Sequence, residues 1–143
     1  MIINELFYQE IEQLLTEVDR DIAGIADISE RLRAFIVQVS GAIEENKDFF
    51  KVYVARLTDE AEKPGTTKMT TTFFDGYVHR LADIIAQGIA SDVFRPIDAG
   101  CIARASFSLM VGSIFIKNVM RVDLDLDQQN NVQIDLLLDA IKE

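Results

Sequence analysis

Hydrophobic residues recur at helical spacing along the whole chain, and segment 97–121 carries two apolar stripes where one is usual. One side of this helix holds Ile102, Ala105, Leu109, Gly112, Ile116 and Met120. A second side holds Ala103, Phe107, Met110, Val111 and Ile114, and the two sides are divided by Ser106, Ser113 and Lys117. A helix on the outside of a small domain buries one stripe, so the second requires another chain, a ligand cavity or lipid.

Lipid is the least favoured of these three. The uninterrupted apolar run is shorter than the roughly 20 residues that span a bilayer, and charged residues such as Asp98 and Arg104 interrupt the segment. The first side has the small residues Ala105 and Gly112 in its seam, which allow a partner helix to approach closely. We therefore interpret that side as the face of a homodimer, and we expect no membrane partner.

The other segments bring the expected number of helices to about six and predict an all-α protein, an orthogonal or antiparallel helical bundle. Asp27 followed by Glu30 indicates the N-cap of the second helix, and Asp98 is the expected N-cap of the two-faced helix. Lys63-Pro64-Gly65 predicts a turn, and the acidic stretch 123–130 predicts a polar linker. The expected helices are 4–22, 27–46, 48–60, 67–91, 97–121 and a last helix that ends at about Ile141.

The last helix is two-sided as well. Ile134, Leu137, Leu138 and Ile141 share one side, and Val132, Leu136 and Ala140 share the other. The last two helices therefore both have more apolar surface than a monomer can cover. We expect a dimer interface made by Ile102, Ala105, Leu109, Gly112, Ile116, Met120, Leu137 and Ile141.

Length and composition indicate one domain, 1–143, because 143 residues that are 49% hydrophobic can bury a core of their own. The single cysteine, Cys101, excludes an internal disulfide framework, and the N-terminus does not resemble a signal peptide. A cytoplasmic protein is the expectation. The formal net charge of −10, with no window rich in Lys and Arg, excludes nucleic acid as a direct ligand of this chain.

No catalytic or metal-binding pattern is recognisable in the sequence. The only histidine, His79, has Gly76 where a di-metal carboxylate motif needs a glutamate, and we expect it to be solvated. The Asp123–Asp127 alternation does not fit a calcium loop, because Gln128 and Ile134 occupy the glycine and glutamate positions. Cys101 is interpreted as a packed structural thiol. We expect no enzyme activity, no metal and no cofactor.

Aromatic residues on the middle helices mark the best place for a ligand. The expected binding residues are Phe35, Val39, Phe50, Tyr53, Phe73, Tyr77, Phe107 and Met110. Pockets are mostly apolar with a few polar groups, which Tyr53 and Tyr77 could supply, so an apolar or aromatic molecule is favoured over a charged one. The alternative is that these rings simply fill the core.

The order of elements resembles the ligand-binding and dimerisation domain of tetracycline-repressor-like (TetR-like) transcriptional regulators. The resemblance rests on Asn4-Glu5-Leu6-Phe7-Tyr8 at the start of a long helix, on the turn Val93–Asp98, and on the apolar Leu136-Leu137-Leu138. It implies that the last two helices pair with their copies in a dimer, and that a cavity between the middle helices binds a small effector.

The resemblance also implies a basic helix-turn-helix head, which the family carries before this domain and which this chain lacks. We therefore expect contact with DNA only through such a missing head. Two other interpretations stay open. The chain could be a helical dimeric interaction or adaptor module without a ligand, or a small helical enzyme whose catalytic residues are not recognisable.

Overall fold

The computed structural model describes residues 2–61 and 69–143, and within them the all-α prediction is confirmed. The expected turn at Lys63-Pro64-Gly65 lies outside the described residues. The helices are α1 (Ile2–Ile22), α2 (Ile28–Glu45), α3 (Lys47–Ala61), α4 (Met69–Ala90), α5 (Ala99–Asn118) and α6 (Leu126–Ile141). All six begin and end within a few residues of their expected bounds, apart from the start of α6.

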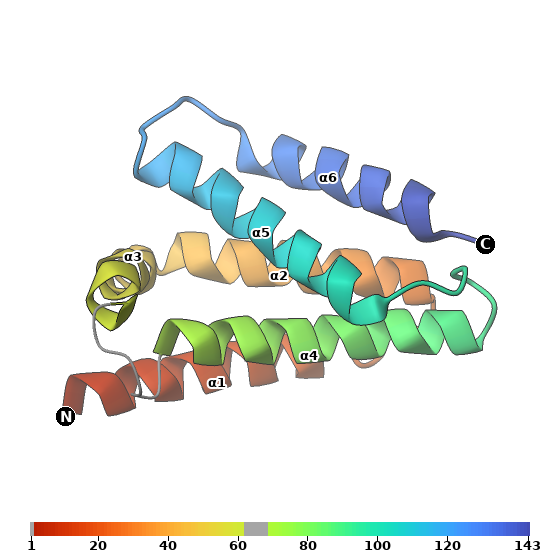
Figure 1. The fold of residues 1–143 in the computed structure, drawn as a ribbon, viewed down its shortest axis with the longest axis horizontal. Helices are drawn as coiled ribbons and strands as arrows, with labels where there is room; N and C mark the ends of the chain where they lie inside the picture. Colours follow the sequence, from red (N-terminus) through yellow and green to blue (C-terminus); the bar gives the residue numbers. More distant parts are fainter. Residues whose placement is uncertain (1, 62–68) are drawn as a thin grey trace.

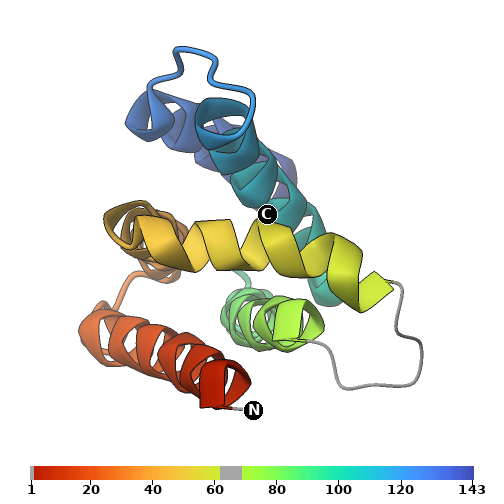
Figure 2. The same ribbon diagram turned by 90° about the vertical axis from the view of Figure 1, so that its left-hand side faces the viewer.

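The helices form a bundle with α1 and α6 on opposite sides (Figure 1). α1 and α4 lie side by side, and α2 packs against both of them. α3 lies across one end of the group formed by α1, α2 and α4. α5 and α6 form an antiparallel pair on the side of this group that is away from α1 (Figure 2). α5 packs mainly on α4, while α6 contacts α5 and α2.

Capping aspartates begin three of the helices. The side chains of Asp27 and Asp98 accept hydrogen bonds from the backbone N–H of Glu30 and Cys101, so both predicted N-caps are confirmed. Asp125 does the same for Gln128, and α6 therefore starts at Leu126.

The prediction of a polar linker over 123–130 is wrong from residue 126 onward, where α6 begins. Leu126 and Asn130 are one helical turn apart and both are buried. The Asn130 side-chain amide donates to the Ser40 hydroxyl at 2.9 Å, which ties the second turn of α6 to α2. Polar side chains in this stretch therefore cap and anchor a helix where their polarity had indicated a loop.

Helix α5 is the one described helix that is long and apolar enough to cross a membrane, judged by length and composition. A third of the relevant window, 33%, is buried inside the bundle. The core helix of a soluble protein passes the same test, and α5 packs along α4 in this fold. Its inner side, with Ala103, Phe107, Met110 and Ile114, is buried.

The turn between α4 and α5 is held by the Phe94 ring on Gly88. The backbone N–H groups of Val93 and Phe94 both donate to the Gly88 carbonyl, at 2.9 and 3.0 Å, and Asp92 takes the left-handed conformation with φ 60. A Cβ on Gly88 would lie 2.2 Å from the Phe94 ring, which is itself buried. Gly88 is therefore required for close packing.

We predict that Gly88→Ala lowers the free energy of unfolding by about 1–3 kcal/mol, because the buried ring must move to admit a methyl group. Gly41→Ala on α2 is the matched control, since a Cβ there meets nothing within 4 Å. The control should be neutral or more stable by up to about 1 kcal/mol, from the better helix propensity of alanine. Urea unfolding measures both, and a Gly88→Ala variant as stable as the wild type would contradict this packing.

Candidate functional site

The aromatic residues expected to bind a ligand do come together, in one cluster at the centre of the bundle. Ring centroids lie 5.8 Å apart for Tyr53 and Phe73, 5.5 Å for Phe73 and Phe107, and 5.2 Å for Phe107 and Tyr77. Phe35 lies 5.0 Å from Tyr77. Such edge-on and tilted contacts at these distances are those of closely packed rings. We call Phe35, Phe50, Tyr53, Phe73, Tyr77 and Phe107 the aromatic cluster.

One hydrogen bond crosses the aromatic cluster. The Tyr77 hydroxyl lies 2.8 Å from the Ser106 hydroxyl, and both residues are buried. Burial raises the pKa of the Tyr77 phenol far above its ordinary value, and the Ser106 hydrogen bond offsets only part of that rise. The phenol is therefore protonated at neutral pH, and its bond to Ser106 fixes α4 against α5.

A cavity of about 410 Å³ opens beside this cluster, where the end of α2, the start of α3 and the end of α5 meet. We call it the α2–α3–α5 cavity. Its size falls within the range of small-molecule sites in proteins. It is lined by Ile43, Glu44, Phe50, Lys51, Val54, Ala55, Lys117, Asn118 and Val119.

The inner wall of this cavity is apolar and its rim is charged. Ile43 and Phe50 are buried, and Phe50 stacks on Tyr53 with 6.2 Å between ring centroids, so the wall continues into the aromatic cluster. At the rim, the Lys117 ammonium donates to the Glu44 carboxylate at 3.0 Å. Lys51 is exposed and has no ion-pair partner among the described residues. The arrangement can hold an apolar group inside and a polar group at the mouth.

This cavity lies beside the expected site and shares one residue with it. Of the eight expected binding residues, Phe50 is the one that lines the α2–α3–α5 cavity. The other seven are buried and do not line this cavity; they are Phe35, Val39, Tyr53, Phe73, Tyr77, Phe107 and Met110. Their burial fits the alternative interpretation, in which these side chains fill the core, and their role in ligand binding stays a prediction.

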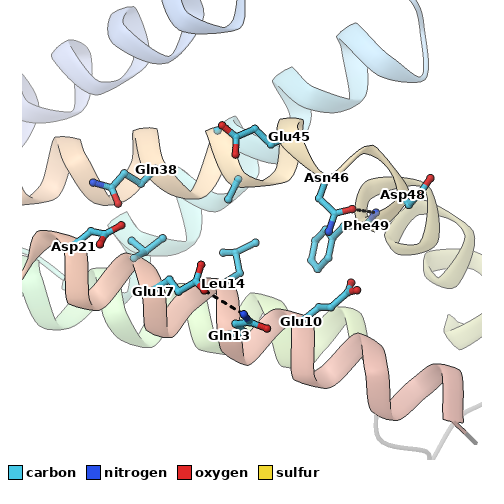
Figure 3. A pocket seen from close by; sticks show the side chains of 13 residues that line it. Glu10, Gln13, Leu14, Glu17, Asp21, Gln38, Glu45, Asn46, Asp48 and Phe49 are labelled. Atoms are coloured by element: carbon cyan, nitrogen blue, oxygen red, sulfur yellow. Dashed lines mark hydrogen bonds between the residues drawn. The ribbon is translucent and has the colours of Figure 1, made fainter.

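A second and larger hollow, of about 1030 Å³, is an open groove between α1 and α2 that reaches the start of α3 (Figure 3). Five carboxylates line it, those of Glu10, Glu17, Asp21, Glu45 and Asp48. Lys and Arg are absent from its described lining. Electrostatically it is the opposite of the α2–α3–α5 cavity, since it repels anions.

The expected dimer face is an exposed apolar surface in the monomer. Eight of the ten large apolar side chains that stay exposed in the described residues lie between Leu109 and Leu136. Leu109 is 47% exposed, Met120 60% and Leu136 66%. Ile102, Ala105, Gly112 and Ile116 are also exposed or half-buried, and the space above Gly112 is open. We call the exposed residues of α5, α6 and their connection the α5–α6 face.

One assignment on α6 needs correction. Ile141 is fully buried and lies in the core of the monomer, so it does not belong to this face. Leu137 is half-buried and lies at its edge. The exposed side of α6 is the one with Val132, Leu136 and Ala140. Sequence reasoning therefore identified both sides of the helix but chose the wrong one to face outward.

The remaining singled-out residues lie apart from these surfaces. The His79 side chain is 78% exposed, 3.6 Å from the Asp83 carboxylate, as expected of a solvated histidine. Cys101 is exposed, because the first turn of α5 presents its side chain to solvent. The interpretation of Cys101 as a packed structural thiol is therefore wrong. Among the described residues no group of three His, Cys, Asp or Glu side chains could hold a metal ion.

Solved structures share this fold. Bacillus subtilis FadR, a transcriptional regulator in complex with stearoyl-CoA, matches with a TM-score of 0.73 and 18% identity, over 96% of this chain and 73% of FadR. The TetR family regulator PfmR of Thermus thermophilus matches with a TM-score of 0.68 and 21% identity, over 96% of this chain and 74% of PfmR. AibR, in complex with isovaleryl coenzyme A and operator DNA, matches with a TM-score of 0.61 and 14% identity, over 94% of this chain and 74% of AibR.

Comparison by sequence agrees with the fold. No curated protein matches the chain. A family model described as "Tetracyclin repressor-like, C-terminal domain" matches residues 26–114, which run from the turn before α2 to the penultimate turn of α5. That stretch is more than half of the chain and includes the aromatic cluster. The chain therefore belongs to the tetracycline repressor-like C-terminal domain family.

Proposed function

We propose that this chain is the ligand-sensing and dimerisation domain of a transcriptional regulator, and that it binds a small, largely apolar molecule in the α2–α3–α5 cavity. The observation that carries the proposal is the cavity of about 410 Å³, whose inner wall, Ile43 and Phe50, adjoins the aromatic cluster. Family membership supports a regulator over an enzyme. A cytoplasmic location is part of the same proposal.

Two of the structural neighbours carry ligands that have an apolar part and a large polar part. FadR was solved with stearoyl-CoA and AibR with isovaleryl coenzyme A. At 18% and 14% identity they share the fold, and their ligands support a ligand of this general shape here. Filling the apolar cavity would remove apolar ligand surface from water, which stabilises the complex by about 25 cal/mol per Å².

A signal from this cavity has a continuous physical route to α1. Phe50 stacks on Tyr53, and Tyr53 contacts Phe73 on α4. One turn further along α4, the space at Gly76 is filled by Leu15 of α1, 2.8 Å from where a Cβ would stand. Arg80 then pairs with Asp19 of α1 at 2.7 Å. In TetR-like regulators the first helix of this domain leads to the DNA-reading head, which makes α1 the natural output.

The α5–α6 face supports the dimer. It includes the exposed side chains of Leu109, Met120 and Leu136, and exposed apolar patches mark interaction sites in soluble proteins. A second copy placed on it by a two-fold axis covers the same residues on both chains. Direct binding of DNA by this chain is not part of the proposal, because its net charge of −10 opposes contact with phosphates.

The cavity is tested by filling it. An apolar probe such as dodecanol should raise the melting temperature of the wild type, since at about 100 times Kd a ligand stabilises by about 2.7 kcal/mol. We expect Ala55→Trp to abolish this rise while leaving stability nearly unchanged, because Ala55 lines the cavity and is exposed. Ala86→Trp, at an exposed position on α4, is the matched control and should keep the rise.

Met110→Trp separates this site from the one expected at the centre of the bundle. Met110 is fully buried and away from the cavity, so the larger ring should overpack the core and cost about 1–3 kcal/mol. If Met110→Trp abolishes binding at full stability and Ala55→Trp leaves it intact, the ligand site is central and our location is wrong.

The dimer is tested by placing a charge on the α5–α6 face. The wild type should be a dimer in light scattering at micromolar concentration, with an interface of about 1,200 Å² or more. Leu136→Glu and Leu109→Glu should each give folded monomers, because a buried carboxylate without a partner is costly. Ala86→Glu should remain a dimer. A monomeric wild type, or dimeric glutamate variants, would exclude this face as the interface.

A further inference from the structure

We propose that the ligand of the α2–α3–α5 cavity is an amphipathic anion, whose apolar chain enters the cavity and whose carboxylate or phosphate group binds Lys51 and Lys117 at the rim. This inference rests on the proposed function and names the chemical class of the ligand. It revises the expectation that charged ligands are disfavoured, because that expectation depended on a cavity lined by rings alone.

The charges at the rim are unusual for this protein. Three ionisable side chains line the cavity, Lys51, Lys117 and Glu44, and together they carry a formal charge of +1. The whole chain carries −10. The neighbouring groove between α1 and α2 is lined by five carboxylates and, in its described lining, by no cation. An anion is therefore repelled by the larger hollow and attracted to the smaller one.

The two lysines differ in how available they are. Lys51 projects from α3, is exposed and has no ion-pair partner among the described residues. Lys117 lies in the last turn of α5 and is paired with Glu44 of α2 at 3.0 Å. Asn118, the polar neighbour on the rim, donates its side-chain amide to the Ile114 carbonyl. Lys51 is thus the first contact for an incoming anion.

Glu44 acts as an internal competitor for Lys117. Its carboxylate occupies the place that a ligand carboxylate or phosphate would take on the Lys117 ammonium. Both side chains are partly exposed, at 30% and 40%, so this ion pair is weak enough for a ligand anion to displace. Removal of the Glu44 charge should therefore strengthen binding, whereas removal of the Lys51 charge should weaken it. A purely structural role for these residues does not produce opposite signs.

Calorimetric titration of the full chain with three probes tests this assignment. Dodecanoate and dodecanol share one chain and differ in the charge of the head group, and dodecanoyl-CoA carries its anionic groups as phosphates. We expect dodecanoate, dodecanoyl-CoA or both to bind about tenfold more tightly than dodecanol, which corresponds to about 1.4 kcal/mol. Whichever anion shows this preference identifies the source of the head group. The preference should shrink as salt is raised, because the rim is exposed.

The variants give the direction of each effect. Lys51→Gln should lower the affinity for the anionic probe until it is close to the affinity for dodecanol. Glu44→Gln should raise the affinity for the anionic probe several-fold. The affinity for dodecanol should stay the same in both variants. Lys142→Gln removes an exposed lysine at the other end of the bundle and should change nothing.

Two outcomes would overturn the inference, and they are distinguishable. If all probes bind equally and Lys51→Gln and Glu44→Gln have no effect, the anionic head group is wrong and an apolar ligand site still stands. If no probe binds to the wild type, both the head group and the proposed ligand site are wrong.

Discussion

Helix α5 has more apolar surface than its own fold covers, and its few polar side chains decide which surface stays inside. Ser106, Ser113 and Lys117 divide the two apolar sides, and each has a specific partner. Ser106 pairs with Tyr77, Ser113 accepts from Gln133 and donates to the Leu109 carbonyl, and Lys117 pairs with Glu44. These contacts reach α4, α6 and α2 in turn, so they fix the rotation of α5 about its axis. The inner side then fills the core, and the outer side remains for another molecule.

The same constraint explains why the cavity lies at the edge of the bundle. Along its middle, α5 is held close to α4 by Phe107, whose ring contacts Phe73 and Tyr77. At its end α5 reaches α2 through the long side chain of Lys117, which pairs with Glu44 beside the cavity. Long, flexible side chains leave space that rings do not, and they bring charge to its border. An apolar wall with a basic rim is the result.

Much of this fold was predictable because its signals are local, as the Asp27 and Asp98 caps show. Errors arose where a local pattern had two solutions: both sides of α6 are apolar, so spacing alone could not show that Ile141 faces inward. The candidate site was harder to predict, because Lys51 and Lys117 are separated by most of α3, α4 and α5 and leave no pattern in an acidic sequence. Helical spacing did group the aromatic residues correctly. Whether facing rings enclose a space or fill it depends on distances of about one ångström, which spacing does not reveal.

The last turn of α5 belongs to both proposed interactions. Lys117, Asn118 and Val119 line the α2–α3–α5 cavity, whereas Ile116 and Met120, on either side of them, lie on the α5–α6 face. Within the proposed function, a ligand that displaces this turn also displaces residues that meet the partner chain, because Ile116 belongs to the same turn and Met120 follows the end of α5 directly. Thermodynamic linkage then makes the effect reciprocal: a dimer that holds the turn in its ligand-binding position favours the ligand by the same factor by which the ligand favours the dimer.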